Sequence, residues 1–299
     1  MDQYVVDNRP LAYDLSAQAF LSSPDFADIR NGLVDGLLDL FENDHLVNRL
    51  ILEEGRYMSY LTALALHAAQ DMSVSSTWLT LGRLQREVTE LGFASRNRVE
   101  AQISCLKKYG MLTQQPQSSD RRVRLLQPTA KMLERDATVL QLHLRAIERL
   151  EGCPPGGFAG DLTPDLHRAI RRTTLNHLES IGRLIRRHKP LAAFMEHDCG
   201  YMIMLLLLQS ARETGSECSA TCFQRLATQT GVSRTHVRRL LESVRDAGLL
   251  TLGGRGGHDI RLNEQMWHAI DLWFAQELAL VAYLFAEARR QDVQPRFAA

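Results

Sequence analysis

The sequence predicts a mainly α-helical fold with short β-hairpins, in which one arrangement of helices and a hairpin is used twice. The composition indicates a globular chain of two domains, because 299 residues with 45% hydrophobic and 23% charged side chains suffice for two ordinary cores. Residues 151–161 begin with EGCPPGGFAG, and two prolines among four glycines cannot continue a helix. We therefore expect domains at 1–150 and 162–299, with 151–161 as the linker.

Residues before and after this linker match one another at nearly constant spacing, which indicates an internal duplication. The offset is 144 residues for the first matches, 138 for the middle ones and 137 for the last, so loops are shorter in the second copy. The matched pairs are Tyr57/Tyr201, Met58/Met202, Leu61/Leu205, Leu64/Leu208, Ser95/Ser233, Arg96/Arg234, Val99/Val237, Gly110/Gly248, Leu112/Leu250, Thr113/Thr251, Arg124/Arg261 and Leu125/Leu262.

In the first copy, apolar spacing and turn residues define the elements. Leu61 and Leu64 keep helical spacing, Gly92 marks a turn, and Ser95 suits the N-cap of the next helix. After Gly110 the pattern becomes strand-like. The expected helices are 27–41, 50–69, 79–91, 95–109 and 129–150, and the expected strands are 111–113 and 123–126.

The second copy repeats this order. Gly231 marks the turn, Ser233 is the expected N-cap, and the pattern becomes strand-like after Gly248. In the closing helix, Ile270 and Phe274 have the spacing of a face that packs against another helix. The expected helices are 164–188, 191–212, 220–230, 233–247 and 263–288, and the expected strands are 249–251 and 260–262.

A short helix, a tight turn, a second helix and a β-hairpin together make a winged helix-turn-helix, so the sequence predicts two such units in tandem. The second helix of this motif lies in the major groove of double-stranded DNA, and the hairpin, or wing, reaches the backbone or the minor groove. We expect the chain to bind DNA in this way through both copies.

On a helical wheel, the second helix of each copy has an apolar inner side and a polar outer side. The inner residues are Val99, Ile103, Leu106, Val237, Leu241 and Val244. The outer residues are Asn97, Ala101, Ser104 and Lys108 in the first copy, and Thr235, Arg239 and Glu242 in the second, flanked by His236 and Arg238. Asn97 and Arg239 suit base edges. The cations expected at phosphates are Arg96, Lys107, Arg234 and Arg245.

The predicted DNA-binding residues come from both second helices and both wings. They are Ser95, Arg96, Asn97, Arg98, Ser104, Lys107, Lys108, Arg121, Arg122, Arg124, Ser233, Arg234, Thr235, His236, Arg238, Arg239, Arg255 and His258.

These residues resemble the MarR-type transcriptional regulators over about 50–150 and, more weakly, 191–288. The run SRNRVEAQISCLKKYGML is similar to that family's recognition helix, and DRRVRLLQPT, with Asp120, Arg122 and Thr129, is similar to its wing. The run SRTHVRRLLESVRDAGLL fits equally well. The second wing, GGRGGHDIRL, departs from the pattern, with Gly257 in place of Asp120 and Asp259 in place of Arg122.

The resemblance implies how the copies are used. Members of that family are symmetric homodimers with interlocking terminal helices, so a duplicated chain is expected to be a single-chain pseudo-dimer that functions as a monomer. The first and last helices of each copy would form its helical pseudo-dimerisation core. The resemblance also implies a small-molecule effector between the wing-bearing lobes and the helical core. Because the copies differ on their outer faces, the expected operator is non-palindromic.

Charge is distributed unevenly between the copies although the whole chain has 35 basic and 35 acidic residues. Residues 1–50 carry nine acidic and three basic side chains, whereas 162–189 carry seven basic and two acidic ones. Opposed charges on equivalent helices favour pairing within one chain. The alternative is that the basic helix is simply a solvated or DNA-facing surface.

Other site chemistries have little in the sequence to indicate them. Cys218, Cys222, His197 and Cys199 include enough soft ligands for zinc, but we interpret the thiols as small buried or loop side chains and expect no metal site. No catalytic motif stands out, so no enzyme, catalytic residue or cofactor is predicted. Five cysteines without CxxC spacing fit a reducing compartment.

We expect no membrane partner, since the longest apolar runs, Tyr201–Leu208 and Leu278–Ala286, fall short of the roughly 20 residues that span a bilayer. The N-terminus lacks the pattern of a secretory signal. The leading interpretation is a cytoplasmic, sequence-specific transcriptional regulator. Two alternatives stay open: a plasmid-type replication initiator with two winged helices, which tends to be more basic, and a chromosome-organisation scaffold that binds protein partners.

Overall fold

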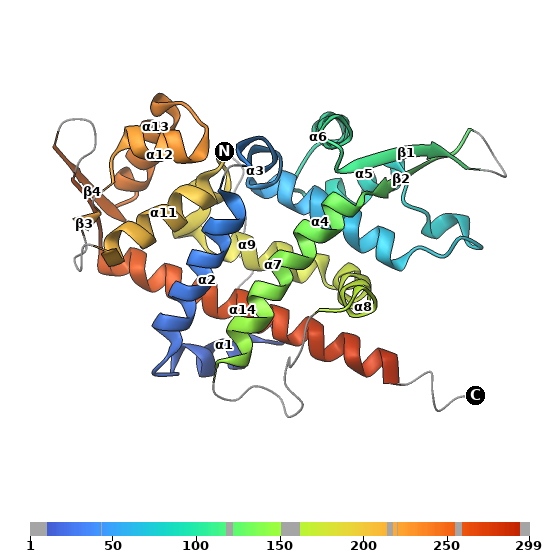
Figure 1. The fold of residues 1–299 in the computed structure, drawn as a ribbon, viewed down its shortest axis with the longest axis horizontal. Helices are drawn as coiled ribbons and strands as arrows, with labels where there is room; N and C mark the ends of the chain where they lie inside the picture. The colour runs from blue at the N-terminus through green and yellow to red at the C-terminus, as the bar shows by residue number, and fades with distance from the viewer. Residues whose placement is uncertain are drawn as a thin grey trace. The chain divides into compact units, whose positions relative to one another are not determined.

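The computed structural model describes residues 11–42, 44–117, 122–150, 162–213, 218–219, 221–254 and 259–293. Within these ranges the chain is mainly helical, with short antiparallel strands (Figure 1). The predicted fold class is confirmed at this level. The linker predicted at 151–161 lies outside the described residues, as do Arg121, Arg255 and His258.

The chain divides into two compact units, and each unit combines segments that lie far apart in the sequence. Unit 1 consists of Met1–Glu54, Arg145–Gly157 and Arg183–Ala279. Unit 2 consists of Gly55–Leu144, Phe158–Gly182 and Leu280–Ala299. The sequence repeat and the compact units thus divide the chain differently, since each unit joins helices of one half to a helix pair and hairpin of the other half.

Unit 2 contains the helix pair and hairpin of the first half. Its elements are α4 (Glu54–Ala69), the 3₁₀ helix η1 (Ser75–Thr77), α5 (Leu81–Glu90), α6 (Arg96–Lys108), β1 (Leu112–Pro116), β2 (Arg124–Pro128), most of α7 (Ala130–Glu148), α8 (Pro164–Leu175), the start of α9 (Leu178–Arg187) and the end of α14 (Glu264–Val293). Strands β1 and β2 are antiparallel, with Leu112 opposite Pro128. An isolated bridge from Thr80 to Leu125 adds a third chain segment beside β2.

Unit 1 contains the corresponding elements of the second half together with the N-terminal helices. Its elements are α1 (Asp14–Leu21), α2 (Phe26–Phe41), α3 (His45–Ile51), the end of α9, the 3₁₀ helix η2 (Lys189–Leu191), α10 (Ala192–Met195), α11 (Gly200–Glu213), β3 (Cys218–Ser219), α12 (Phe223–Thr230), α13 (Arg234–Asp246), β4 (Leu250–Gly253), β5 (Asp259–Leu262) and most of α14. The three strands are antiparallel neighbours in the order β3, β5, β4.

The helices differ from the predicted ranges mainly where the chain bends. Helix α1 and strand β3 were not predicted, and the helices expected at 50–69, 164–188 and 191–212 are each interrupted. The bend before α11 depends on a close approach, because a Cβ on Gly200 would lie 2.0 Å from the carbonyl oxygen of Phe194. Cys199 beside it has a φ of 55°, in the left-handed region. The spacing of apolar residues in the sequence does not predict this close approach of Gly200 to the Phe194 carbonyl.

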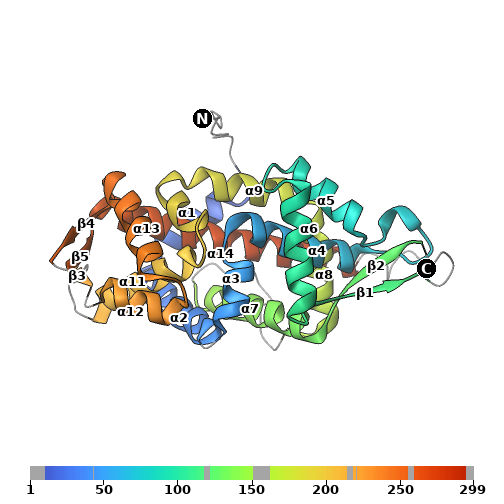
Figure 2. The same cartoon turned by 90° about the horizontal axis from the view of Figure 1, so that it is seen from above.

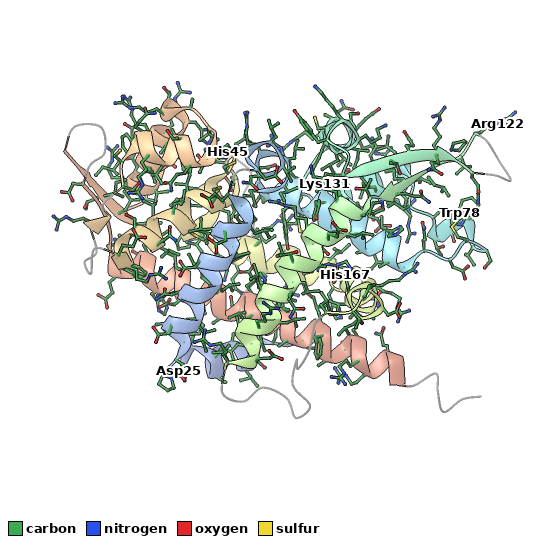
Figure 3. All side chains as sticks on the ribbon, viewed as in Figure 1. Asp25, His45, Trp78, Arg122, Lys131 and His167 are labelled. Carbon is green, nitrogen blue, oxygen red and sulfur yellow. The ribbon has the colours of Figure 1, made fainter. Side chains whose placement is uncertain are left out.

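A buried arginine–aspartate pair joins the two halves of the sequence within unit 2. Arg171 of α8 donates from Nε and Nη2 to the carboxylate oxygens of Asp136 on α7, at 2.6 and 2.8 Å. His167 of α8, labelled in Figure 3, places Nε2 2.6 Å from Asp136 Oδ2. Burial opposes ionisation of Asp136, but the charge of Arg171 and the hydrogen bonds from His167 and Arg171 outweigh it and lower the pKa of Asp136.

A comparable pair joins the two halves within unit 1. Arg30 of α2 forms an ion pair with Asp271 of α14, and its guanidinium lies 5.6 Å from the ring centroid of Trp267. Arg30 and Arg171 both follow a buried isoleucine, in Ile29-Arg30 and Ile170-Arg171, and both arginines are buried. In each unit, therefore, a helix from one half of the sequence brings a buried cation to the closing helix of the other half.

A polar chain further connects the start of the sequence to its second half in unit 1. Asp14 of α1 accepts hydrogen bonds from Arg187 of α9 at 2.9 Å and from Gln276 of α14 at 3.0 Å. Buried His188 donates from Nε2 to Gln276 Oε1 at 2.7 Å. Here the opposed charges of the N-terminal and basic segments do pair, whereas Arg168, Arg172 and Lys189 of the basic segment are exposed.

Helix α14 contains a segment, Glu264–Gln291, that is long and apolar enough to cross a membrane. The apolar run Leu278–Ala286 lies within it, and the helix reaches this length because isolated polar residues such as Gln276 interrupt the apolar sequence without ending the helix. Of its most apolar window, 67% is buried inside the protein, which is typical of a core helix.

We expect Asp136→Asn to lower the free energy of unfolding by about 3–5 kcal/mol, because it leaves the buried Arg171 without its counter-charge. Chemical denaturation at pH 7 measures this decrease. The lowered pKa of Asp136 also predicts that the stabilisation is present above pH 4 and is lost as the pH falls below the ordinary value of 3.8.

The matched control is Asp35→Asn. Asp35 pairs with Arg212 at 2.9 Å, but both side chains are more than one third exposed, at 39% and 37%. This substitution is expected to cost roughly 0–1 kcal/mol. Equal destabilisation of the two variants would contradict a special role for the buried pair.

A second prediction concerns His188, whose pKa burial lowers from 6.5. Below pH 6.5 the unfolded chain takes up a proton that the folded chain resists, so the free energy of unfolding should fall as the pH drops, by at most about 1.4 kcal/mol per pH unit. His188→Gln should reduce this slope, as measured by urea unfolding between pH 7.5 and 5. Substituting exposed His268 by Gln is the control, and an unchanged slope in His188→Gln would refute the prediction.

Candidate functional site

Each unit carries two short helices joined by a turn and followed by an antiparallel hairpin. In unit 2 these are α5, α6 and the β1–β2 hairpin, and in unit 1 they are α12, α13 and the β4–β5 hairpin (Figure 2). In both units the first helix packs against the second, and the second helix contacts the first strand of the hairpin. The same order of elements thus occurs twice, as the sequence repeat predicts.

The turn and the N-cap set the direction of the second helix. Ser95 Oγ accepts a hydrogen bond from the Arg98 amide at 3.4 Å, and Ser233 Oγ accepts one from the His236 amide at 3.1 Å. These bonds satisfy amide groups that have no partner within the helix. Both predicted N-caps are confirmed.

The exit from the second helix is also the same in the two units. Gly110 and Gly248 have φ values of 70° and 76°, which a residue with a side chain rarely adopts. The amide of Met111 then bonds to the Leu106 carbonyl at 2.9 Å, and the Leu249 amide bonds to the Val244 carbonyl at 3.2 Å. This C-terminal motif turns the chain abruptly from the helix into the strand.

One side chain in each unit fastens the end of the hairpin to this turn. Thr129 Oγ1 donates to the Gly110 carbonyl at 2.7 Å and accepts from the Met132 amide at 3.4 Å. In unit 1, Asn263 donates from Nδ2 to the Gly248 carbonyl and accepts from the Met266 amide at 2.9 Å. Thr129 and Asn263 therefore connect the helix, the hairpin and the start of the next helix in the same way.

The predicted inner and outer faces agree with the burial of the side chains. The inner residues Val99, Ile103, Leu106, Val237, Leu241 and Val244 are all at most 2% exposed. On the outer side, the exposed residues are Ser95, Arg96, Asn97, Arg98, Ala101, Ser104 and Lys108 of the first copy and Ser233, Arg234, Thr235, Arg238 and Arg239 of the second. His236, Glu242 and Lys107 are half-buried.

Several predicted contact residues already have partners within the protein. Lys107 Nζ donates to Gln114 Oε1 of β1 at 2.9 Å, which ties α6 to the hairpin. His236 Nε2 donates to the Asp198 carbonyl at 3.0 Å, which ties α13 to the bend before α11. Both residues hold the second helix in place.

Two cations of α13 are paired with acids of the same helix. Arg238 lies 3.1 Å from Glu242, and Arg245 lies 2.7 Å from Asp246. Such surface pairs contribute little to stability, but they neutralise charge. Arg239 stands between them, and no acid in the described part of the chain pairs with it.

Other exposed guanidinium groups also remain without an ion pair or hydrogen bond in the described part of the chain. In the helix pairs and hairpins they are, besides Arg239, Arg96, Arg124, Arg225 and Arg234, and Arg149 and Arg168 have the same property elsewhere in the described chain. Arg225 on α12 was not among the predicted residues, because the winged helix-turn-helix motif assigns base contacts to its second helix. These groups retain their full capacity to bind an anion.

The two hairpins differ in charge. Arg122, labelled in Figure 3, and Arg124 are exposed on the first hairpin. On the second hairpin, Arg261 is bound to Asp259 at 2.9 Å. The other predicted wing residues, Arg121, Arg255 and His258, lie outside the described residues. Among the described hairpin cations, Arg124 is the most available.

The cysteine cluster considered from the sequence is not assembled in the described part of the chain, where no group of three or more His, Cys, Asp or Glu side chains is placed to hold a metal ion. Neither Cys199 nor Cys222 forms a disulfide among the described residues; Cys199 is buried, and Cys222 is half-buried at the N-cap of α12. His197 Nδ1 donates to the Ala193 carbonyl at 2.7 Å. The thiol of Cys218 is not among the described side chains.

Comparisons of the chain with protein-family models, with curated proteins and with solved structures give no match. The geometry of the two helix pairs and the charges that they expose are therefore the features from which a function is inferred.

Proposed function

We propose that the chain is a sequence-specific, DNA-binding transcriptional regulator whose two units are winged helix-turn-helix modules. The observation that carries the proposal is the duplicated second helix. In both units it is capped by serine, buried on its apolar side and fastened to a hairpin, and it begins with an exposed arginine, Arg96 or Arg234. A helix held this firmly and exposed along one side suits insertion into the major groove.

In the proposed complex, α6 and α13 are the recognition helices. Arg96 and Arg234 occupy the first position of each helix, where a free guanidinium meets a phosphate beside the positive end of the helix dipole. The residues one and two turns along the exposed side would meet base edges. The hairpins would reach the flanking backbone or minor groove, with Arg122 and Arg124 of the first hairpin as the main cations.

The proposal extends to how the chain is assembled. A homodimer supplies two DNA-binding modules from two chains, whereas this chain carries both modules itself. We therefore propose that the protein acts as a monomeric pseudo-dimer of the MarR type. Because its two recognition helices differ on their outer sides, one chain would bind one non-palindromic operator. A small-molecule effector and a cytoplasmic location belong to the same proposal, on the strength of the resemblance and the composition.

Neutral overall charge is compatible with this function because phosphate affinity depends on local charge. The acids of α13 are occupied by Arg238 and Arg245, while Arg234 and Arg239 are free. A scaffold that binds only protein partners would not need unpaired arginines at equivalent positions of two helices. The two roles differ in one measurable property, the salt dependence of binding to duplex DNA.

We expect the double variant Arg96→Ala with Arg234→Ala to bind duplex DNA more weakly than the unmodified chain. The slope of log affinity against log salt concentration should decrease by about one unit for each phosphate that the variant no longer neutralises. Fluorescence anisotropy with a labelled duplex between 50 and 300 mM salt measures both quantities. Arg290→Ala is the control, since Arg290 is 67% exposed on α14, away from both helix pairs in sequence. Unchanged affinity and slope in the double variant would contradict the proposal and favour a scaffold.

The hairpins should contribute unequally. Arg124→Ala removes a free cation and is expected to lower the salt slope by about one unit. Arg261→Ala removes a cation that is already bound to Asp259, so its effect on the slope should be smaller. Parallel titrations of the two variants on the same duplex compare them. Equal decreases in slope would show that the Asp259 ion pair does not persist in the complex.

A further inference from the structure

The outer sides of the two proposed recognition helices are chemically different, and the difference follows a consistent pattern. With the offset of 138 residues that relates Ser95 to Ser233, one exposed stripe on each helix can be compared position by position. The pairs are Asn97/Thr235, Ala101/Arg239, Ser104/Glu242 and Lys108/Asp246. The stripe of α6 has no charge at its first three positions, whereas the stripe of α13 has a cation followed by two acids.

At the centre of the α13 stripe, Arg239 presents an unoccupied guanidinium. It is exposed and has no ion pair or side-chain hydrogen bond among the described residues, while the neighbouring Arg238 is held by Glu242. A guanidinium presents parallel N–H donors in a rigid fork. Only guanine offers two acceptors, O6 and N7, side by side in the major groove. Arg239 is therefore suited to a G·C base pair.

Glu242 lies one turn after Arg239 on the same stripe and strengthens this preference. Its carboxylate is oriented by Arg238 at 3.1 Å and is 34% exposed. A carboxylate accepts hydrogen bonds but cannot donate them, and cytosine N4 is the base donor that glutamate typically contacts. The phosphate backbone would repel the same group. A glutamate here thus restricts which sequences the helix tolerates.

The corresponding positions of α6 suit the other base pair. Ala101 replaces Arg239 and offers only a methyl group, which fits against the methyl group of thymine. Asn97, at the start of the stripe, has one donor and one acceptor, the combination that pairs with adenine N7 and N6. Lys107, beside the stripe, donates to Gln114 of β1, and the only cation of the stripe itself, Lys108, stands at its last position.

We infer that the two units read half-sites of different base composition: unit 1 reads a G·C-containing half-site through Arg239 and Glu242, and unit 2 reads an A·T-containing half-site through Asn97 and Ala101. The inference rests on the proposed function. The residue pair Ala101/Arg239 determines the difference in base preference, because the first copy has a methyl group where the second copy has a guanidinium.

The test is a binding-site selection from a random duplex library, carried out with the full chain and with two variants. The unmodified chain should select one G·C-rich and one A·T-rich half-site. Arg239→Ala should reduce the preference for guanine at one position roughly tenfold and leave the A·T-rich half unchanged. Ala101→Arg, at an exposed position, should introduce a new guanine preference into the A·T-rich half.

Two further variants separate the effect of the planar guanidinium shape from the effect of the positive charge. Ala101→Lys adds the same charge as Ala101→Arg but lacks the rigid planar fork, so it should raise affinity with a weaker guanine preference than Ala101→Arg gives. Arg239→Lys should likewise keep most of the affinity and weaken the guanine preference.

The possible results distinguish the inference from the proposed function. Similar base composition in both half-sites, or a guanine preference that survives Arg239→Ala, would overturn the inference while leaving DNA binding established. Salt-independent binding with no selected sequence would overturn the proposed function itself.

Discussion

A buried arginine needs a carboxylate, and this requirement holds each unit of the protein together. Asp136 receives two hydrogen bonds from Arg171 and one from His167 in a fully buried setting, and Arg30 meets Asp271 in the other unit. Removing one partner would leave an uncompensated charge in the interior, which costs far more than a surface pair contributes. Because the partners come from different halves of the sequence, each unit is completed only when both halves are present.

On this base, short-range contacts give the second helix of each pair a defined start, end and inclination. The serine N-cap fixes its start, a glycine in the left-handed region ends it, and Thr129 or Asn263 ties the hairpin to the same glycine carbonyl. These contacts recur in both units although the side chains differ. A threonine hydroxyl and an asparagine amide each supply one donor and one acceptor, so the geometry is preserved while the sequence diverges.

Pairing within the protein decides which cations remain available to a ligand. Lys107 and His236 are used to hold their helices, and Arg238, Arg245 and Arg261 are bound to acids. Arg96, Arg124, Arg225, Arg234 and Arg239 are left with unoccupied guanidinium groups. A count of basic residues alone would not distinguish the five paired side chains from the five unpaired ones. These five groups lie on the helix pairs and the first hairpin, and they are the cations on which the proposed binding of phosphate depends.

The sequence by itself determined the local architecture. The order of elements in the two helix pairs and their hairpins, both N-caps, and the inner and outer sides of α6 and α13 follow from signals within about 15 residues, such as helical spacing or a glycine after a polar run. The composition of the two units, the bend at Gly200 and the pairing of Lys107 with Gln114 did not follow. Arg171 and Asp136 are 35 residues apart, and Arg30 and Asp271 are 241 residues apart. No periodic pattern marks such partners, because they are selected only when packing brings two buried faces together.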